Sequence, residues 1–445
     1  MCRFFKVTAL VFVLLAGAAL ASGAPTNYLI VAKAQGRGSA DLDDLVGLAG
    51  GTITAKIPEI GVVLASSFNP DFLAVVTADP RVQKAAEDVE VEWIPREKVV
   101  KASGSDFQVT GVNSEPGWSL QWNIRQIHAD QTATNGDMGW GVKRSRVAVL
   151  DSGIWSGHPD IASNLNLGLS TSFVPTEPDI DPIVSGFNHG THVAGIIAAP
   201  INGEGVQGVA PQAEIVAVKV LRSDTGNGQF SWLIQGLIYA ANIEADVANM
   251  SLGATFDRIN KGGGGAGPLI AALDRAINYA TSAGVLCVSS AGNEGVNLNN
   301  RLWSIPAQSG NGMAVAATGP VDFYHLGDSA VFDRAASYTN YGRSVINVAA
   351  PGGDDTLYPA SIYVYDMVLS PAGYSGGAWE YWFADGTSQA APHVSGVAAL
   401  IVGKHGKTSP ARLKALIQKT ADDILKPGVD PYSGNGRINA LKAVR

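Results

Sequence analysis

The chain has 445 residues and a formal net charge of −8, from 31 lysines and arginines and 39 aspartates and glutamates. An acidic chain without a basic run lacks the charge pattern of a nucleic-acid-binding protein. Hydrophobic residues make up 46% of it and cysteines number only 2, which excludes a disordered chain and a disulfide-stapled scaffold.

Residues 1–24 have the pattern of a secretory signal peptide. Arg3 and Lys6 form a basic start, an apolar stretch runs from Val7 to Ala21, and Ala19-Leu20-Ala21 offers a cleavage site. The apolar stretch is short for a membrane span, although an uncleaved anchor remains an alternative. We expect the mature protein to be secreted, extracellular and free of the membrane.

Residues 25–95 form a compositional unit of their own. Strands are predicted at Tyr28–Val31, across Thr52–Ser66 and at Val89–Trp93, and helices at Asp41–Leu48 and after an N-cap at Asn69. The order βαββαβ indicates a small ferredoxin-like α+β module. Residues 96–117 are polar and lack periodicity, which predicts an exposed linker where proteolysis concentrates.

From residue 118 to residue 445, apolar strands alternate with amphipathic helices. This alternation predicts an α/β domain with a mostly parallel, doubly wound sheet covered on both faces. The predicted strands are Arg146–Leu150, Glu214–Val220, Val247–Met250, Val285–Ser289, Met313–Ala317 and Val345–Ala349. The predicted helices are Thr191–Ala199, Trp232–Ile243, Ile270–Ala283, Ser388–Lys404 and Pro410–Lys419.

Four polar side chains stand where these elements begin or end. Asp151 and Asn293 follow predicted strands, whereas His189 and Ser388 precede or open predicted helices. In such sheets the chemistry gathers at the strands' carboxyl ends. A serine that attacks a carbonyl needs a base, an imidazole suits that role, and a carboxylate orients the imidazole. An amide donor such as Asn293 binds the oxyanion, so the set predicts nucleophilic acyl transfer.

Five segments with these residues resemble motifs of the subtilisin family of serine proteases, in the family's order Asp, His, Ser. They are Asp151-Ser152-Gly153-Ile154, His189-Gly190-Thr191-His192-Val193-Ala194-Gly195, Asn249-Met250-Ser251-Leu252-Gly253, Ala291-Gly292-Asn293-Glu294-Gly295 and Gly386-Thr387-Ser388-Gln389-Ala390-Ala391-Pro392-His393-Val394. The resemblance covers about residues 118–445, and residues 27–95 resemble the family's inhibitory, fold-assisting propeptide.

The resemblance implies a role for each of the four side chains. Asp151 would orient the imidazole, His189 would be the general base, Ser388 the nucleophile and Asn293 the oxyanion donor. It further implies substrate-binding residues, which are Ser251, Leu252 and Gly253 on one strand, Gly228 on the opposite edge, Phe230 in the S4 pocket and Ser304 near the base of S1. A small residue at 304 favours large apolar or aromatic P1 side chains.

The resemblance also implies a structural Ca²⁺ site. The side-chain ligands would be Asp160 and Asn202, joined by the backbone carbonyl oxygens of Pro200, Glu204 and Val206. Oxygen ligands of these kinds are what Ca²⁺ prefers, and the alternative is an ordinary polar turn.

Several segments depart from the family pattern or imitate other motifs. Gln389 replaces a methionine beside the nucleophile, Arg258–Gly267 forms an extra loop, and Asp354–Tyr381 has no clear assignment. Gly373–Gly377 matches G-x-S-x-G but lacks a strand before it and a helix after it, which predicts a turn. Cys287 lies in an apolar run and is predicted to be a buried, inert thiol.

Together these patterns predict a secreted serine endopeptidase of broad specificity that acts on proteins or peptides through an acyl-enzyme. We expect a monomer with Ca²⁺ as its cofactor and no nucleic-acid partner. Its own propeptide would inhibit it and be removed autocatalytically within residues 96–117. The alternatives are a pseudoenzyme that only binds peptides and an esterase acting on small acyl esters.

Overall fold

The computed structural model describes residues 23–36, 41–107, 115–257 and 266–445. Residues 1–22 of the expected signal peptide and most of the extra loop at 258–267 lie outside the described residues. The chain divides into two compact units: a smaller N-terminal unit up to Asp88 with residues 257–271, and a large unit of residues 89–256 and 272–445. Within the described ranges, no helix is long and apolar enough to cross a membrane.

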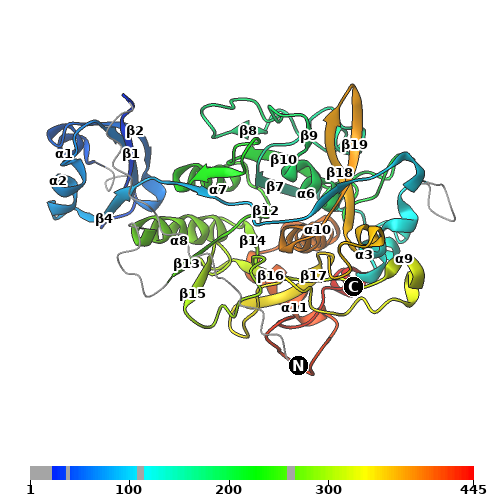
Figure 1. The fold of residues 1–445 in the computed structure, drawn as a ribbon. Helices are drawn as coiled ribbons and strands as arrows, with labels where there is room; N and C mark the ends of the chain where they lie inside the picture. The colour runs from blue at the N-terminus through cyan, green and yellow to red at the C-terminus, as the bar shows by residue number, and fades with distance from the viewer. Residues whose placement is uncertain (1–22, 37–40, 108–114, 258–265) are drawn as a thin grey trace, which may run out of the picture. The chain divides into compact units, whose positions relative to one another are not determined.

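The N-terminal unit is an antiparallel α+β module, drawn in blue in Figure 1. Its sheet has the strand order β2-β3-β1-β4, and its core includes Ile30, Val46, Val63 and Phe72. The elements are β1 (Thr26–Ala32), α1 (Asp43–Leu48), β2 (Gly51–Ile57), η1 (Pro58–Ile60), β3 (Val62–Ser67), α2 (Phe72–Ala78) and β4 (Val82–Glu87).

Two local expectations for this module were wrong. Its last strand is β4, which pairs with β1, and not Val89–Trp93. Three residues of β4 are buried and they do not alternate along the strand, so the sequence gave little alternating signal. Asn69 does not cap α2: its Oδ1 accepts from the N–H of Asp71 at 3.0 Å, which forms a turn before the helix begins at Phe72.

The large unit is built on a seven-stranded parallel sheet with the order β17-β16-β14-β12-β7-β10-β8 (Figure 1). Its strands are β7 (Arg146–Asp151), β8 (Thr171–Ser172), β10 (Glu214–Lys219), β12 (Val247–Met250), β14 (Leu286–Ser290), β16 (Met313–Thr318) and β17 (Ile346–Pro351). Six of them were predicted within a residue or two, because strands buried on both faces are continuous apolar runs. The short strand β8 was missed.

Helices cover both faces of this sheet. Val149 and Ala217 point into the core shared with α6 and α10, which pack on each other. Their neighbours Leu150 and Val218 point the other way, toward Gly236 on α7. The larger helices are α6 (His189–Ala198), α7 (Phe230–Asn242), α8 (Ala266–Ser282), α10 (Thr387–His405) and α11 (Pro410–Thr420). All five were predicted from the sequence.

Short elements complete the large unit. They are β5 (Glu90–Glu92), β6 (Val99–Lys101), η2 (Gly104–Asp106), η3 (Trp118–Leu120), α3 (Trp122–Gln126), α4 (Ala129–Thr134), α5 (Pro159–Ala162), β9 (Gly186–Phe187), β11 (Asn227–Gln229), β13 (Ala254–Asp257), β15 (Leu302–Ile305), α9 (Phe323–Leu326), η4 (Gly327–Ser329), η5 (Ser361–Asp366) and α12 (Ala440–Ala443). The predicted linker therefore contains a strand and a 3-10 turn within its described residues.

The unassigned stretch 354–381 contributes a long β-hairpin. Strands β18 (Val368–Ser375) and β19 (Ala378–Ala384) form its two arms, orange in Figure 1, in a sheet of order β6-β19-β18-β9. Gly376 and Gly377 form the turn with φ of 58° and 83°, a backbone that two-residue hairpins favour. The G-x-S-x-G match therefore lies on this hairpin turn.

Candidate active site

Asp151 and His189 meet at the carboxyl edge of the parallel sheet. Asp151 is the last residue of β7, and His189 is the first residue of α6 after the N-cap Asn188. His189 Nδ1 lies 2.8 Å from Asp151 Oδ1 and 3.0 Å from Oδ2, so the imidazole donates to the carboxylate. The backbone N–H of Ser152 also donates to Asp151 Oδ1, at 2.7 Å, and fixes the carboxylate.

Ser388 lies in the first turn of α10, where the helix N-terminus favours negative charge. Its side chain is buried, and its backbone carbonyl accepts from Ser251 Oγ at 2.7 Å. Within the described residues, Ser388 Oγ and His189 Nε2 are both buried without a hydrogen-bond partner. The serine–imidazole hydrogen bond is therefore not formed in this structure; such bonds often form only in the reacting complex.

Asn293 faces the same place from the loop after β14. Its Oδ1 accepts from Thr387 N–H at 2.9 Å and from Thr387 Oγ1 at 2.8 Å. These two bonds assign the oxygen of the amide to the Thr387 side, so the Nδ2 group points to the opposite side. Its Nδ2 donates to the backbone carbonyl of Arg96 at 3.2 Å. A Cβ at Gly386 would lie 3.0 Å from Asn293 Nδ2, so a glycine there leaves room for the amide. The amide therefore presents one donor to one carbonyl of the chain itself.

Residues before Arg96 lie extended between two edges of the large unit. Strand β5 pairs antiparallel with β11, with Val91 opposite Gly228. Trp93 N–H donates to the Gly226 carbonyl at 3.3 Å, and Gly253 N–H donates to the Trp93 carbonyl at 2.7 Å. This segment is the light-blue chain that runs from α7 toward the β18–β19 hairpin in Figure 1. It is held as a peptide would be held by strand addition.

The Trp93 ring anchors this segment. Its side chain is fully buried, its Nε1–H donates to the Gly228 carbonyl at 3.0 Å, and it meets the Phe230 ring edge-on at 4.9 Å. Phe230 also lies 6.1 Å from the Phe256 ring. An aromatic side chain three residues before Arg96 is thus seated in an apolar pocket with its polar atom satisfied.

Residues after Arg96 follow a second edge, on β19. Lys98 N–H donates to Asp385 Oδ1 at 2.8 Å, and Asp385 N–H donates to the Lys98 carbonyl at 3.2 Å. The side chain of Glu97, the residue before Lys98, is only 4% exposed, and its Oε1 lies 3.5 Å from His189 Nε2. Gln389 Nε2 donates to Glu97 Oε2 at 3.4 Å. The chain therefore passes through the site continuously from β11 to β19.

The electrostatics separate His189 from the other buried histidines. Burial alone would lower the pKa of His189, but the charges of Asp151 and Glu97 raise this pKa to about 10. Burial lowers the pKa of His192 to about 3 and that of His393 to about 4. His192 Nε2 donates to the carbonyls of Val368 and Trp382, so it holds the hairpin as a neutral ring.

The remaining predicted substrate residues surround the same segment. Ser251, Leu252 and Gly253 follow β12, and the Leu252 carbonyl accepts from Ser290 Oγ at 3.2 Å. Ser304 is buried, and its Oγ would lie 3.8 Å from a Cβ at Gly253. Cys287 is buried too, and burial raises the pKa of its thiol to about 12, as suits an inert side chain.

Three residues of the predicted calcium set are joined by hydrogen bonds. Asp160 Oδ1 accepts from Asn202 Nδ2 at 3.1 Å, and Oδ2 accepts from Val206 N–H and Tyr381 Oη, each at 2.9 Å. Burial raises the pKa of Asp160 to about 7, and the charge of Glu115 adds to it. In the part of the chain that is described, no group of three His, Cys, Asp or Glu could hold a metal.

Glu115 completes this region but was not predicted. It is 1% exposed, and its Oε1 accepts from the N–H of Gly203 at 2.9 Å in the loop that contains Pro200 and Glu204. No spacing in the sequence links residue 115 to residue 160. The sequence also gave Trp93, Arg96 and Glu97 no place at this site, because the alternation of Val89–Trp93 was assigned to the N-terminal module and residues 96–117 to an exposed linker.

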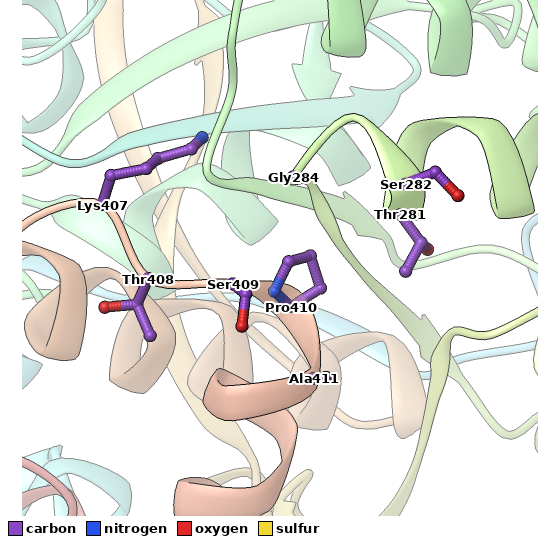
Figure 2. Close-up of a pocket in the computed structure, with 8 residues that line it drawn as sticks. All are labelled: Thr281, Ser282, Gly284, Lys407, Thr408, Ser409, Pro410 and Ala411. Atoms are coloured by element: carbon purple, nitrogen blue, oxygen red, sulfur yellow. The ribbon is translucent and has the colours of Figure 1, made fainter.

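Two hollows on the large unit differ in chemistry. One of about 430 Å³, seen in Figure 2, has no carboxylate or imidazole in its lining and offers no acid–base pair; it is lined by Thr281, Ser282, Gly284, Lys407, Thr408, Ser409, Pro410 and Ala411. The other, of about 280 Å³, lies at His189; its lining is Glu92, Ile94, Pro95, Arg96, Glu97, Val99, Ser152, Phe187, His189, Ser223, Thr225 and Gly226.

Comparisons with known proteins agree on one family. A model described as the subtilase family matches residues 143–436. M-protease of Shouchella clausii (strain KSM-K16) is 35% identical over 384 residues, which cover 86% of this chain and 79% of that protein. Subtilisin BL of Lederbergia lenta is 38% identical over 328 residues, covering 74% of this chain and 99% of that protein. The solved structure of the epidermin leader peptide processing serine protease from Staphylococcus aureus has a TM-score of 0.75 at 22% identity, covering 95% of this chain and 98% of that one, and this likeness shows the fold.

Proposed function

The chain belongs to the subtilase family and is a subtilisin-like serine endopeptidase, and we propose that it is exported as a precursor that cuts itself between Arg96 and Glu97. The observation that carries the proposal is the hydrogen bond of Asn293 Nδ2 to the Arg96 carbonyl at 3.2 Å. This contact supports the proposal, because the amide that would stabilise the oxyanion donates here to the Arg96 carbonyl.

The side chains of the site have defined roles in this reaction. Ser388 Oγ attacks the Arg96 carbonyl carbon while His189 Nε2 accepts the hydroxyl proton, and Asp151 holds the imidazole and stabilises its charge. Asn293 Nδ2 donates to the developing oxyanion. His189 then gives its proton to the departing nitrogen of Glu97, and water hydrolyses the acyl-enzyme by the same steps in reverse.

Protein substrates would take the place of the chain's own segment. The edges of β11 and of the strand before Gly253 pair with main chain, which makes them tolerant of sequence and supports broad specificity. The S4 pocket at Phe230 favours an aromatic side chain such as that of Trp93. Ser304 leaves S1 roomy for large apolar or aromatic side chains. Because Arg96 precedes the proposed cut, arginine should also be tested at the P1 position of peptide substrates.

The remaining parts of the precursor have roles before the cut. Residues 1–24 are the signal peptide, and residues 25–95, with Arg96 as the last residue before the cut, form a propeptide that assists folding and inhibits the enzyme. Inhibition is supported by the way residues 90–96 fill the substrate-binding edges. The mature enzyme acts outside the cell on protein or peptide substrates as a monomer.

A structural Ca²⁺ fits the region around Asp160. Two buried carboxylates, Asp160 and Glu115, lie beside one loop, and their mutual repulsion is what a divalent cation would remove. Asp160, Asn202 and Glu115 would supply side-chain oxygens, and Pro200, Glu204 and Val206 would supply backbone carbonyls. The ion would stabilise the fold and take no part in the peptide cleavage.

The test is to produce the wild-type precursor and Ser388→Ala in parallel. The wild type should yield a mature chain that begins at Glu97 and hydrolyses casein, whereas Ser388→Ala should stay uncut and inactive with an unchanged circular dichroism spectrum. A mature chain with a first residue elsewhere, or a Ser388→Ala chain that still cuts itself, would contradict the proposed cleavage.

A further inference from the structure

The β18–β19 hairpin offers a long strand edge beyond the cleavage point. Strand β6 pairs antiparallel with β19, with Val99 opposite Ala384, Val100 opposite Phe383 and Lys101 opposite Trp382. Hydrogen bonds from Asp385 N–H to the Lys98 carbonyl and from Ala102 N–H to the Tyr381 carbonyl extend the ladder at both ends. Main-chain pairing thus runs from the second to the sixth residue after Arg96.

The first cation of this segment has an acidic and aromatic receptor. Lys98 Nζ pairs with Asp355 Oδ2 and lies 3.7 Å from the centroid of the Tyr358 ring. The Asp355 side chain is 25% exposed, so the pair is partly shielded from water. A partly desolvated carboxylate and an aromatic face that meet at one ammonium group select a cation by two independent interactions.

The second cation has a more buried receptor. Lys101 Nζ pairs with Glu380 Oε1, and the Glu380 side chain is only 2% exposed. Trp382 Nε1–H donates to Glu380 Oε2 at 3.1 Å, and Ser375 Oγ donates to Oε1, so the carboxylate is held in place by its own hairpin. A buried, oriented carboxylate discriminates strongly against a neutral partner.

We propose that, in the mature enzyme, the β19 edge binds the part of a polypeptide substrate that follows the cleaved bond, and selects lysine as its second and fifth residues through Asp355 and Glu380. This inference rests on the proposed function and specifies its substrates: extended chains that continue at least five residues past the cut. The occupant seen in the structure, residues 97–101, is the first such chain. After the cut, the same edge is filled by an incoming protein.

The experiment uses quenched fluorescent peptides and mature wild-type enzyme. All peptides share Trp-Ile-Pro-Arg before the cut, and the parent continues with Glu-Lys-Val-Val-Lys-Ala. Replacing the second or the fifth residue by alanine should lower kcat/KM roughly 3- to 10-fold in each case, the effect of a partly buried ion pair. A peptide that ends at the first residue past the cut lacks both lysines, so its kcat/KM should fall by the product of the two single reductions.

Enzyme variants assign each preference to its receptor. Asp355→Asn should reduce the lysine-over-alanine ratio at the second position to about 1 while the ratio at the fifth persists, and Glu380→Gln should do the reverse. Asp137→Asn is the matched control, because Asp137 pairs with Lys404 at the far end of α10 from Ser388, and it should keep both ratios.

The outcomes separate this inference from the proposed function. If all peptides are cut after arginine at equal kcat/KM, the enzyme assignment stands and the lysine-selecting edge is overturned. The same follows if the ratios stay at wild-type values in Asp355→Asn and Glu380→Gln, or if residues 97–106 remain on β19 in the mature enzyme and block it. If no peptide is cut, the proposed function itself fails.

Discussion

Glu97 places a carboxylate against His189, the base of the cleavage proposed above, and replacing Glu97 by glutamine should speed that self-cleavage at neutral pH. Its Oε1 lies 3.5 Å from His189 Nε2, the atom that must accept the serine proton. The charged groups facing this imidazole are Asp151 on one side and Glu97 on the other, and both raise its pKa. An imidazole that is already protonated cannot act as the base, so Glu97 delays its own release.

The magnitude follows from the 3.5 Å separation of the two atoms. Coulomb's law gives about 1 kcal/mol with the dielectric constant of water and about 5 kcal/mol with an effective value near 20, which corresponds to a change in the His189 pKa of roughly 1 to 3.5. With a pKa of about 10 for His189, only about one imidazole in a thousand is neutral at pH 7. Removing the Glu97 charge lowers the pKa, so Glu97→Gln should cut itself roughly 10- to 1000-fold faster at pH 7.

The assay measures the rate of self-cleavage after refolding the precursor at pH values from 5 to 10. The rate rises with pH as His189 loses its proton, and in Glu97→Gln this rise should occur at lower pH. Glu59→Gln is the matched control, since it removes an equal charge from an exposed turn of the N-terminal unit. The imidazole pKa itself can be measured by NMR in precursors that also carry Ser388→Ala and cannot cut themselves.

The reasoning is refuted if the pH profile of Glu97→Gln coincides with that of the wild type. It is also refuted if the NMR titration of His189 is the same with glutamate and with glutamine at position 97. A variant that cuts itself more slowly at every pH would assign Glu97 a positioning role in place of an electrostatic one.

Four other substitutions or treatments have defined outcomes. Asn293→Ala should lower kcat on a peptide substrate about 10²- to 10³-fold with little change in KM, because its donor acts on the oxyanion. Trp93→Ala should weaken inhibition of the mature enzyme by added propeptide at least 10-fold in a Ki titration, since a fully buried ring is lost. Chelation by EGTA should lower the Tm of the wild type by roughly 5–10 °C and leave that of Asp160→Ala unchanged, because only the former holds Ca²⁺. Mild peroxide should leave casein hydrolysis intact, since Gln389 offers no thioether beside Ser388, and peptide mapping would locate any oxidation that inactivates.

The parts of this fold that were predicted are those in which local pattern and burial agree. The strands from Arg146 to Pro351 are apolar because both faces of the sheet are covered, and the helices keep one apolar face. Strand β8 has two half-buried residues and left no such trace. The hairpin of β18 and β19 mixes aromatic, acidic and glycine residues, because the outer edge of β19 pairs with strand β6 and does not lie in the hydrophobic core.

The residues of the candidate site also fall into two groups, those that local sequence patterns predicted and those that they did not. Asp151, His189, Asn293 and Ser388 stand at element ends within distinctive local motifs, so their sequence contexts were enough to predict them as site residues, and their catalytic roles stay predictions. Residues 90–101 gave no such signal, since their partners lie more than 130 residues away for β5 and more than 280 for β6. In sequence, a strand such as β5, which pairs with a sheet edge far along the chain, looks the same as a strand that pairs within the N-terminal unit.

The uncut chain uses both substrate edges at once, and this has a consequence for activation. Before the cut, residues on either side of Arg96 are held at high effective concentration because they are part of one chain. After it, residues up to Arg96 are a separate chain anchored by Trp93, whereas residues from Glu97 remain part of the enzyme and leave the β19 edge independently, against the pairs of Lys98 and Lys101. Full activity on long substrates then requires both halves to leave, whereas a short peptide that uses only β11 requires only the first. The appearance of the two activities during maturation should therefore be separated in time whenever the second half leaves more slowly.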